Sequence, residues 1–347
     1  MESQTIHVMD KIFRAFRVFK RFLLAHEVLL LVALGVSILC FSLSTERFPT
    51  SRTFNVIATQ CAEIGLMGLG MGLTIMVGGV DLSVNDTANL SALVAGLFLT
   101  RLPSVFVSAS VHVFISILLA LCVGVLCGYF NGFLVAHLQV PPVLASLGTL
   151  TLFRGISAAV TGGTRIAGFP RGISVIGRGS MLGVPIPFLI LLVSGLLMHL
   201  IVNHSTLGYK IRYVGTNIRA AKLSGIKDKS TIVITYVLSG LLSSIAGIII
   251  MGRTGSVAYE YGTQTYVLVA RAITSLAAIS PGSGTVASLI LSALILQVLS
   301  TGFYSIMMTS SRASFFKDIF WGIFMIAILI FEQVIKHARK PHLKKSE

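Results

Sequence analysis

The stretch GLGMGLTIMVGGVDLSVND (residues 68–86) begins as an apolar helix and then turns polar within an apolar region. Gly78 and Gly79 can end the helix, because glycine has no Cβ and reaches backbone angles that other residues avoid. Ser83 and Asp86 have the spacing of a capping box, and a carboxylate in a first turn suits the helix dipole. The sequence therefore predicts a helix break, defined by Gly78, Gly79, Asp81, Ser83 and Asp86.

The polar residues of this break have two compatible interpretations. Capping of the two helix ends is the simpler role for Ser83 and Asp86. A charge inside a bilayer is costly, and broken helices there face protein or a water-filled cavity. Contact with a translocation path is therefore the alternative, above all for Asp81 and Asn85.

The composition indicates a polytopic membrane protein. Of the 347 residues, 54% are hydrophobic and 11% charged, whereas about 25% of a soluble domain is charged. Apolar runs long enough to cross the ~30 Å hydrocarbon layer recur along the chain. We predict an all-α fold of about ten transmembrane helices, some broken or re-entrant. The expected spans are 28–45, 56–77, 84–100, 107–135, 143–161, 185–202, 231–251, 264–280, 285–303 and 318–335, of which the third and eighth are partial crossings.

The basic residues predict the orientation and the domain boundaries. The net charge is +15, concentrated in the N-terminal segment, in the loop 203–230 and in the tail. An even number of spans places these clusters on one side, which the positive-inside rule makes cytoplasmic, together with both termini. This pattern favours a lipid bilayer, not nucleic acid, as the partner of the basic residues. The expected parts are a basic amphipathic helix or solvated basic face at 1–26, a membrane domain at 27–335 and a tail at 336–347.

Enzyme and metal-site signatures are missing from the sequence. The four cysteines have no metal-ligand spacing, and there is no His-Glu-x-x-His or Gly-x-Ser-x-Gly motif, so we expect no catalytic residues and no metal site. No lysine follows a glycine, so the chain has no P-loop to hold ATP. If transport is driven by ATP, the nucleotide and Mg²⁺ must bind to a partner ATPase.

Several polar residues lie within the apolar spans and are expected to face protein or water. One interpretation of these residues is structural. Arg271 could form an ion pair with Asp81 or Glu63, and Asn131 could form a hydrogen bond between helices. The other is contact with a solute. The candidates for the translocation path are Gln60, Glu63, Asp81, Asn85, Asn89, Asn131, Gln264, Tyr266 and Arg271.

Three motifs carry a resemblance to a known family. GGVDLSV (78–84) resembles the Gly-Gly-Ile-Asp-Leu-Ser-Val hallmark of permease subunits of ABC importers of the ribose/branched-chain amino acid class, on its sugar side. GYFNGFLVAHLQVPPVLASLGTLTLFRGISAAVTGG (128–163) and GTNIRAAKLSGI (215–226) are similar to two further motifs of that family, in the family's order. The chain departs from the pattern at Asn85, usually glycine, and in SLAAISPGSGT (275–285), which lacks the usual glycine cluster.

The resemblance, which runs from about 28 to 335, implies the permease subunit of an ATP-driven, binding-protein-dependent importer of a monosaccharide or sugar-like solute. It implies alternating access in the bacterial cytoplasmic (inner) membrane. The implied partners are a cytoplasmic ABC ATPase, which binds ATP and Mg²⁺, a periplasmic or extracellular solute-binding protein, and a second permease copy or paralogue.

The loop 203–230 is the expected site of coupling to the ATPase. Thr216 can cap a short helix over 217–224, which Gly225 can end. By resemblance this is a coupling helix, and its residues are Gly215, Thr216, Asn217, Arg219, Ala220, Ala221, Lys222 and Gly225.

An ion-coupled secondary transporter is the alternative function. Broken helices suit such a protein, and Glu63, Asp81 and Asp86 would be its ion carriers.

Overall fold

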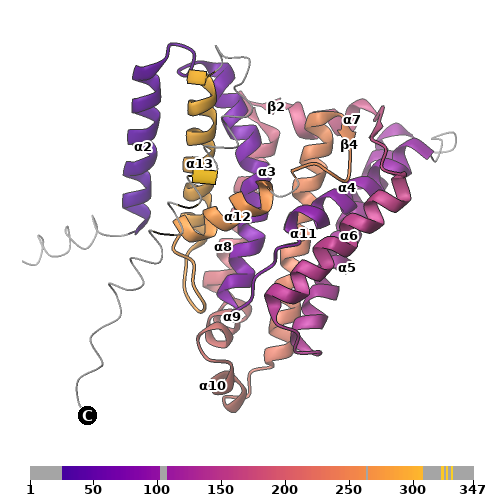
Figure 1. Ribbon diagram of the computed structural model, residues 1–347, viewed down its shortest axis with the longest axis vertical. Coiled ribbons are helices and arrows are strands. Elements are labelled where there is room, and N and C mark those ends of the chain that lie inside the picture. The colour runs from indigo at the N-terminus through magenta and orange to yellow at the C-terminus, as the bar shows by residue number, and fades with distance from the viewer. Residues whose placement is uncertain are drawn as a thin grey trace, which may run out of the picture.

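The computed structural model describes residues 26–101, 108–262 and 265–307, together with the single positions 322, 323, 326 and 330. Regular structure in this part is almost entirely helical (Figure 1). The longer helices are α2 (His26–Ser44), α3 (Ser51–Met76), α4 (Val84–Arg101), α5 (Ala109–Ala136), α6 (Pro142–Thr161), α8 (Ile186–His204), α11 (Asp228–Thr254) and α13 (Val286–Met307). The shorter helices are α7 (Arg171–Arg178), α9 (Thr206–Thr216), α10 (Ile218–Leu223) and α12 (Thr265–Leu276).

Two short antiparallel strand pairs accompany the helices. β1 (Ile166–Ala167) pairs with β4 (Ser256–Val257), and β2 (Ser180–Met181) pairs with β3 (Val184–Pro185). Both pairs involve the segment 162–184, and in Figure 1 they lie at the end of the molecule opposite α9 and α10.

Within the described residues, seven helices are long and apolar enough to cross a membrane: α2, α3, α5, α6, α8, α11 and α13. They correspond to seven of the ten predicted spans. The two spans expected to be partial crossings correspond to α4, which is more polar than the other long helices, and to α12, which has only twelve residues. The tenth span, the basic N-terminal segment and the tail lie almost wholly outside the described residues, so the count of ten and the location of the termini stay predictions.

Helix α11 packs against α3, α4 and α5 at the centre of the bundle (Figure 1). Its contact with α5 is made by backbone against backbone. A Cβ added at Gly128 would lie 2.3 Å from the carbonyl oxygen of Tyr236, and one added at Gly240 would lie 2.1 Å from that of Gly124. Glycine at these positions lets the two helices approach closely, as small residues do in membrane bundles.

The predicted helix break is present. Helix α3 ends at Met76 and α4 begins at Val84, and Gly78 has a φ of 93°, which favours glycine. In Figure 1 α3 ends near α9, and the chain then runs back into the bundle before α4 starts. A second irregular segment precedes α12, and a hairpin at 277–285, closed by a bridge between Ser280 and Ser283, joins α12 to α13.

Candidate functional site

Four buried residues form a hydrogen-bonded polar cluster at the helix break: Asp81, Ser83, Asn131 and Ser239. Asp81 Oδ1 accepts hydrogen bonds from the backbone N–H of Ser83 (3.0 Å) and from its hydroxyl (2.7 Å). The hydroxyl of Ser239 on α11 donates to Asp81 Oδ2 at 2.8 Å, and Asn131 Nδ2 on α5 donates to Ser83 Oγ at 2.7 Å. The cluster therefore ties the break to both central helices.

The capping box predicted for Ser83 and Asp86 is wrong in its side-chain hydrogen bonds. Ser83 does directly precede α4, but its hydroxyl donates to Asp81. The carboxylate of Asp86 accepts from Arg154 Nε (2.9 Å) and Nη2 (3.2 Å). Both bonds are charge-assisted and join two opposite charges, so Arg154 takes the place of the backbone N–H that a capping box would offer to Asp86.

A second ion pair joins Glu63 on α3 to Arg253 at the end of α11. Arg253 donates to both carboxylate oxygens, at 3.0 Å from Nη2 to Oε2, and the hydroxyl of Tyr266 donates to Oε2 at 3.3 Å. An ion pair of Arg271 with Glu63 or Asp81 was one interpretation, but the contacts of the described residues pair Glu63 with Arg253 and Asp81 with two serines. Arg271 Nη1 donates to Thr274 Oγ1 at 3.3 Å.

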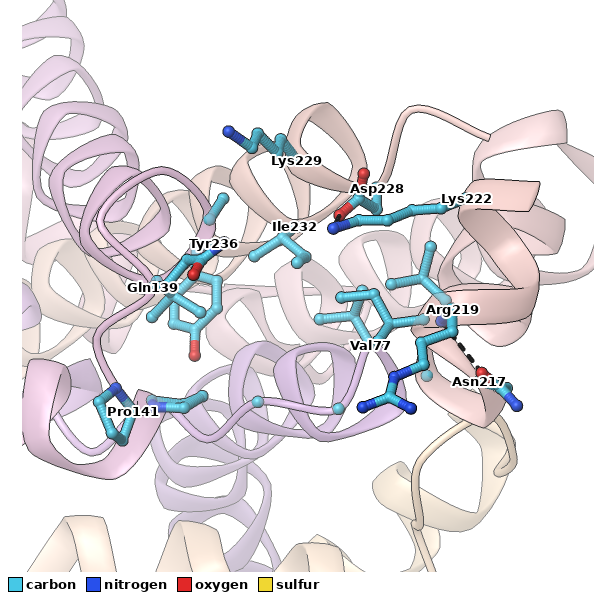
Figure 2. Close-up of a pocket in the computed structure, with 18 of the residues that line it drawn as sticks. Val77, Gln139, Pro141, Asn217, Arg219, Lys222, Asp228, Lys229, Ile232 and Tyr236 are labelled. Atoms are coloured by element: carbon cyan, nitrogen blue, oxygen red, sulfur yellow. Dashed lines mark hydrogen bonds and ion pairs between the residues drawn. The ribbon is translucent and has the colours of Figure 1, made fainter. Parts of the chain in front are cut away.

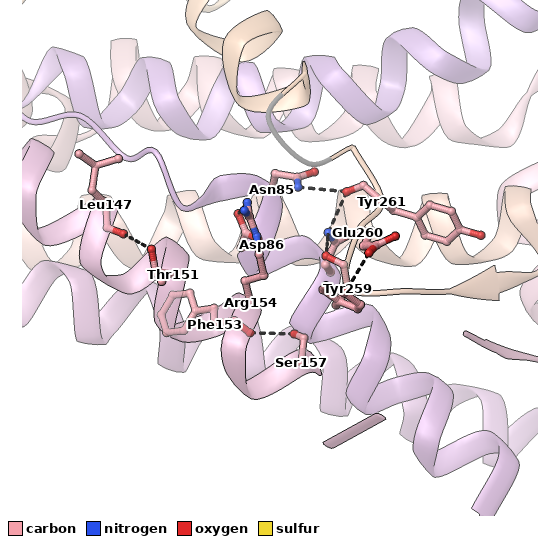
Figure 3. Close-up of polar contacts among 11 residues, drawn as sticks. Asn85, Asp86, Leu147, Thr151, Phe153, Arg154, Ser157, Tyr259, Glu260 and Tyr261 are labelled. Carbon is pink, nitrogen blue, oxygen red and sulfur yellow. Dashed lines mark hydrogen bonds and ion pairs between the residues drawn. The ribbon is translucent and has the colours of Figure 1, made fainter. Parts of the chain in front are cut away.

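The remaining predicted path residues bind other protein groups. Asn85 donates to the carbonyl of Tyr261 at 3.0 Å (Figure 3). Asn89 donates to the same carbonyl at 2.8 Å and to that of Tyr259 at 3.3 Å. They thereby satisfy backbone of the irregular segment that precedes α12. Gln60 accepts a hydrogen bond from Gln297 at 2.8 Å. Gln264 lies outside the described residues.

Two acceptors in this region stay unused. Asn85 Oδ1 and Asn131 Oδ1 are buried, and within the part of the chain that the structure describes neither has a hydrogen-bond partner. Buried polar atoms are normally satisfied by protein, water or a ligand. Asn85 on α4 and Asn131 on α5 therefore each offer an acceptor to a hydroxyl group or a water molecule.

A cavity of about 900 Å³ lies beside the break (Figure 2). Its wall joins segments that are far apart in the sequence: the break itself, the α5–α6 connection, α10 and the first turns of α11. The lining residues include Val77, Gly78, Gly79, Gln139, Pro141, Asn217, Arg219, Lys222, Asp228, Lys229 and Tyr236. The expected coupling segment and the helix break therefore share one cavity, which the sequence does not reveal.

The short helix expected in the loop 203–230 is present as α10. Its N-cap is Asn217, whose Oδ1 accepts from the backbone N–H groups of Arg219 and Ala220, both at 3.0 Å. The prediction of Thr216 as the cap is wrong, because Thr216 is the last residue of α9 and its hydroxyl donates to the carbonyl of Arg212 at 2.9 Å. Gly225 ends the helix as predicted, with a φ of 77°.

Helix α10 exposes apolar and basic side chains together. Leu223 is 91% exposed and Ile218 is 43% exposed, whereas Ala221 is fully buried and belongs to the main hydrophobic core. Lys222 forms an ion pair at 3.4 Å with Asp228, in the first turn of α11. This pair connects α10 to the central helix of the bundle.

The end of α9 meets the end of α3 and the hairpin 277–285. A Cβ added at Gly215 would lie 1.9 Å from the carbonyl oxygen of Met76, so the two backbones are in direct contact. The same carbonyl accepts a hydrogen bond from Gly282 N at 2.9 Å, and Arg212 Nη2 donates to the carbonyl of Gly284 at 3.1 Å. The residues just before α10 therefore touch the start of the helix break.

Sequence reasoning missed several residues of the site. Tyr236 and Ser239 lie within a long apolar helix, where nothing in the sequence distinguishes them from packing residues. Arg253 pairs with Glu63, which is 190 positions away in the sequence. No local pattern marks these partners. The motif GTNIRAAKLSGI did identify the loop on which Gly215 and Asn217 lie.

Sequence comparisons relate this chain to a known protein family. The family described as "Branched-chain amino acid transport system / permease component" matches residues 54–330. The autoinducer 2 import system permease protein of Salmonella typhimurium (strain LT2) is 26% identical over 303 residues, 87% of this chain and 84% of the relative. The ribose import permease protein of Bacillus subtilis (strain 168) is 31% identical over 277 residues, 78% of this chain and 82% of the relative.

A further relative covers a shorter region. The galactofuranose transporter permease protein of Escherichia coli (strain K12) is 36% identical over 199 residues, 56% of this chain and 54% of the relative. No solved structure gives a significant match to this chain. With seven apolar helices among its described residues and a family match over most of its length, the chain is a multi-pass protein of the bacterial inner membrane that belongs to the permease-component family of branched-chain amino acid transport systems.

Proposed function

We propose that this chain is the membrane-spanning permease subunit of an ATP-driven, binding-protein-dependent importer of a monosaccharide or sugar-like solute. The names of its relatives support the solute class, since ribose and galactofuranose are sugars. The amides of Asn85, Asn89 and Asn131 suit such a solute, because a neutral polyol needs hydrogen-bonding groups without fixed charge.

The observation that carries the proposal is the position and surface of α10. A helix of six residues is unstable alone, and an exposed leucine beside an arginine and a lysine is a surface that a partner can cover. We infer that this partner is a cytoplasmic ABC ATPase, which binds ATP and Mg²⁺. The basic residues of the loop favour a cytoplasmic location for α10, since the positive-inside rule associates such clusters with the cytoplasmic side.

The solute would enter from the opposite end of the molecule. There a pocket of about 590 Å³ is lined by residues of α3, α7 and α11, among them Arg52, Asn55, Gln60, Arg178 and Arg253. We propose that a solute-binding protein docks over this end and over the segment 162–184. The solute then passes the helix break and leaves through the cavity beside α10, in a complex with a second permease copy or paralogue.

Energy would reach the path as a shift between two packings of the helices. A ligand moves such an equilibrium only by its different affinity for the two states, so ATP must change how the ATPase holds α10. The contacts of Gly215 with Met76, and of Lys222 with Asp228, connect α10 to the break and to α11.

The ion-coupled alternative finds little support in the site. Glu63 and Asp86 are each held by an arginine, and Asp81 is held by two serines. The relatives support an importer.

Replacing residues 217–225 with a neutral flexible linker tests the proposal. We expect ATP-dependent uptake into vesicles to be lost while the protein still inserts into the membrane, because the ATPase loses its contact. The assay uses the complete complex and the sugar that binds to the partner binding protein. Retained uptake would show that coupling lies elsewhere, and a binding protein that takes no sugar-like solute would refute the solute class.

A further inference from the structure

Tyr236 is one of the residues that line the cavity beside α10 (Figure 2). This side chain is fully buried, and its hydroxyl donates to the carbonyl of Val80 at 3.2 Å. A Cβ added at Gly79 would lie 2.5 Å from the tyrosine oxygen. The tip of the ring therefore rests directly on the backbone of the helix break.

The polar cluster lies directly behind this contact. Val80 immediately precedes Asp81, and Ser239, which donates to Asp81, is one turn beyond Tyr236 on α11. Asn131 belongs to the segment of α5 that packs on Tyr236, where a Cβ added at Gly132 would meet the tyrosine Cβ at 3.2 Å. Tyr236 thus stands between the cavity and the cluster.

We propose that Tyr236 is the gate on the cytoplasmic side of the transport path, separating the cavity beside α10 from the polar cluster. The proposal rests on the function proposed above and names the residue that closes its path. When the ring moves aside, Asn131 Oδ1 becomes an acceptor for a hydroxyl of an uncharged solute or for water. One neutral hydrogen bond contributes little net stability, so the contact between Tyr236 and Val80 can break in every cycle.

The gate is connected to α10 from both of its sides. The acceptor, Val80, lies in the break whose first residues contact α9 through Gly215 and Met76. The donor, Tyr236, lies on α11, whose first turn is paired with α10 through Asp228 and Lys222. A displacement of α10 therefore acts on both halves of the contact.

A reporter behind the gate tests this assignment. Ser239→Cys places a thiol in the polar cluster with little change of size. The full chain is placed in two kinds of vesicle, one with the α10 side facing outward and one with the opposite side facing outward. Both are treated with a charged, membrane-impermeant methanethiosulfonate reagent. Mass spectrometry then measures the fraction of chains labelled at position 239 over time. Native Cys127, one turn before Asn131 on α5, is a second reporter in the same experiment.

We expect the thiol at position 239 to react slowly when Tyr236 is present and faster in the Tyr236→Ala background. The faster reaction should occur with reagent added on the side that bears α10. Because closed proteins populate their minor open state at about 0.1–10%, loss of the gate should accelerate labelling about tenfold or more. Tyr236→Phe, which keeps the ring and loses the hydroxyl, should lie between the two. Tyr129→Ala, which removes a half-exposed tyrosine on the outside of α5, should change nothing.

Equal labelling rates with and without Tyr236 would overturn the gate, and so would a label that enters only from the opposite side. A Tyr236→Ala protein that is monodisperse yet labels slowly at both cysteines would also overturn it. The labelling needs neither ATP nor solute, so its result stands apart from the uptake assay that tests the proposed function.

Discussion

Arg154 and Asp86 show at the scale of single residues how this protein accommodates charge among apolar helices. The Asp86 side chain is fully buried, and that of Arg154 is 28% exposed. Two parallel hydrogen bonds join them, so neither charge is left without a partner. A paired charge is tolerated in such surroundings, whereas a single one is costly.

Arg154→Gln should therefore destabilise the protein. It leaves the Asp86 carboxylate buried without its cation, which costs about 3 kcal/mol or more. The expected result is a lower melting temperature in detergent. Asp86→Asn added to Arg154→Gln removes both charges and should recover most of the loss. A single variant as stable as the parent would show that the pair has no structural role.

The sequence predicted which residues are polar within the spans but not their partners. An ion pair of Arg271 with Asp81 or Glu63 was one interpretation, whereas Glu63 binds Arg253, which is 190 positions away. Likewise Thr216 and Asn217 are both good caps, and the choice between them depends on where α9 ends. These outcomes are set by tertiary packing, which local patterns do not contain.

At the scale of elements, the contact between α9 and α3 connects the coupling segment to the helix break. It depends on Gly215, because the Met76 carbonyl occupies the space that a side chain would need. The positions of the seven apolar helices and the break at Gly78 could be predicted from hydropathy and glycine spacing, whereas α7 and α9 were not predicted. The contact itself could not, since Gly215 belongs to a surface loop and Met76 to the end of a buried helix.

Gly215→Ala should disturb this junction. Its methyl group would overlap the Met76 carbonyl oxygen, and such overpacking costs about 1–3 kcal/mol. We expect a lower melting temperature together with reduced ATP-dependent uptake by the complete complex. Gly148→Ala on α6 is the matched control, because a Cβ there meets nothing within 4 Å. Equal effects of the two changes would mean that the junction carries no coupling.

At the scale of the whole molecule, we propose that the two ends of the bundle bind different partners. One end carries α9, α10 and the cavity beside them, and the other carries α7 and the strand pairs (Figure 1). Composition and charge predicted a membrane protein and an orientation. They could not show that the break and the loop meet at one cavity, because that depends on how helices from distant parts of the chain pack together.

The most direct test of the account is site-specific crosslinking of the permease to the ATPase. A photo-crosslinking amino acid replaces Leu223, which is 91% exposed on α10, or Leu182, which is 96% exposed between β2 and β3 at the other end. In membranes that contain the complete transporter, the account predicts a crosslink to the ATPase from position 223 and none from position 182. An ATPase crosslinked from position 182, or from neither position in a complex that still transports, would contradict it.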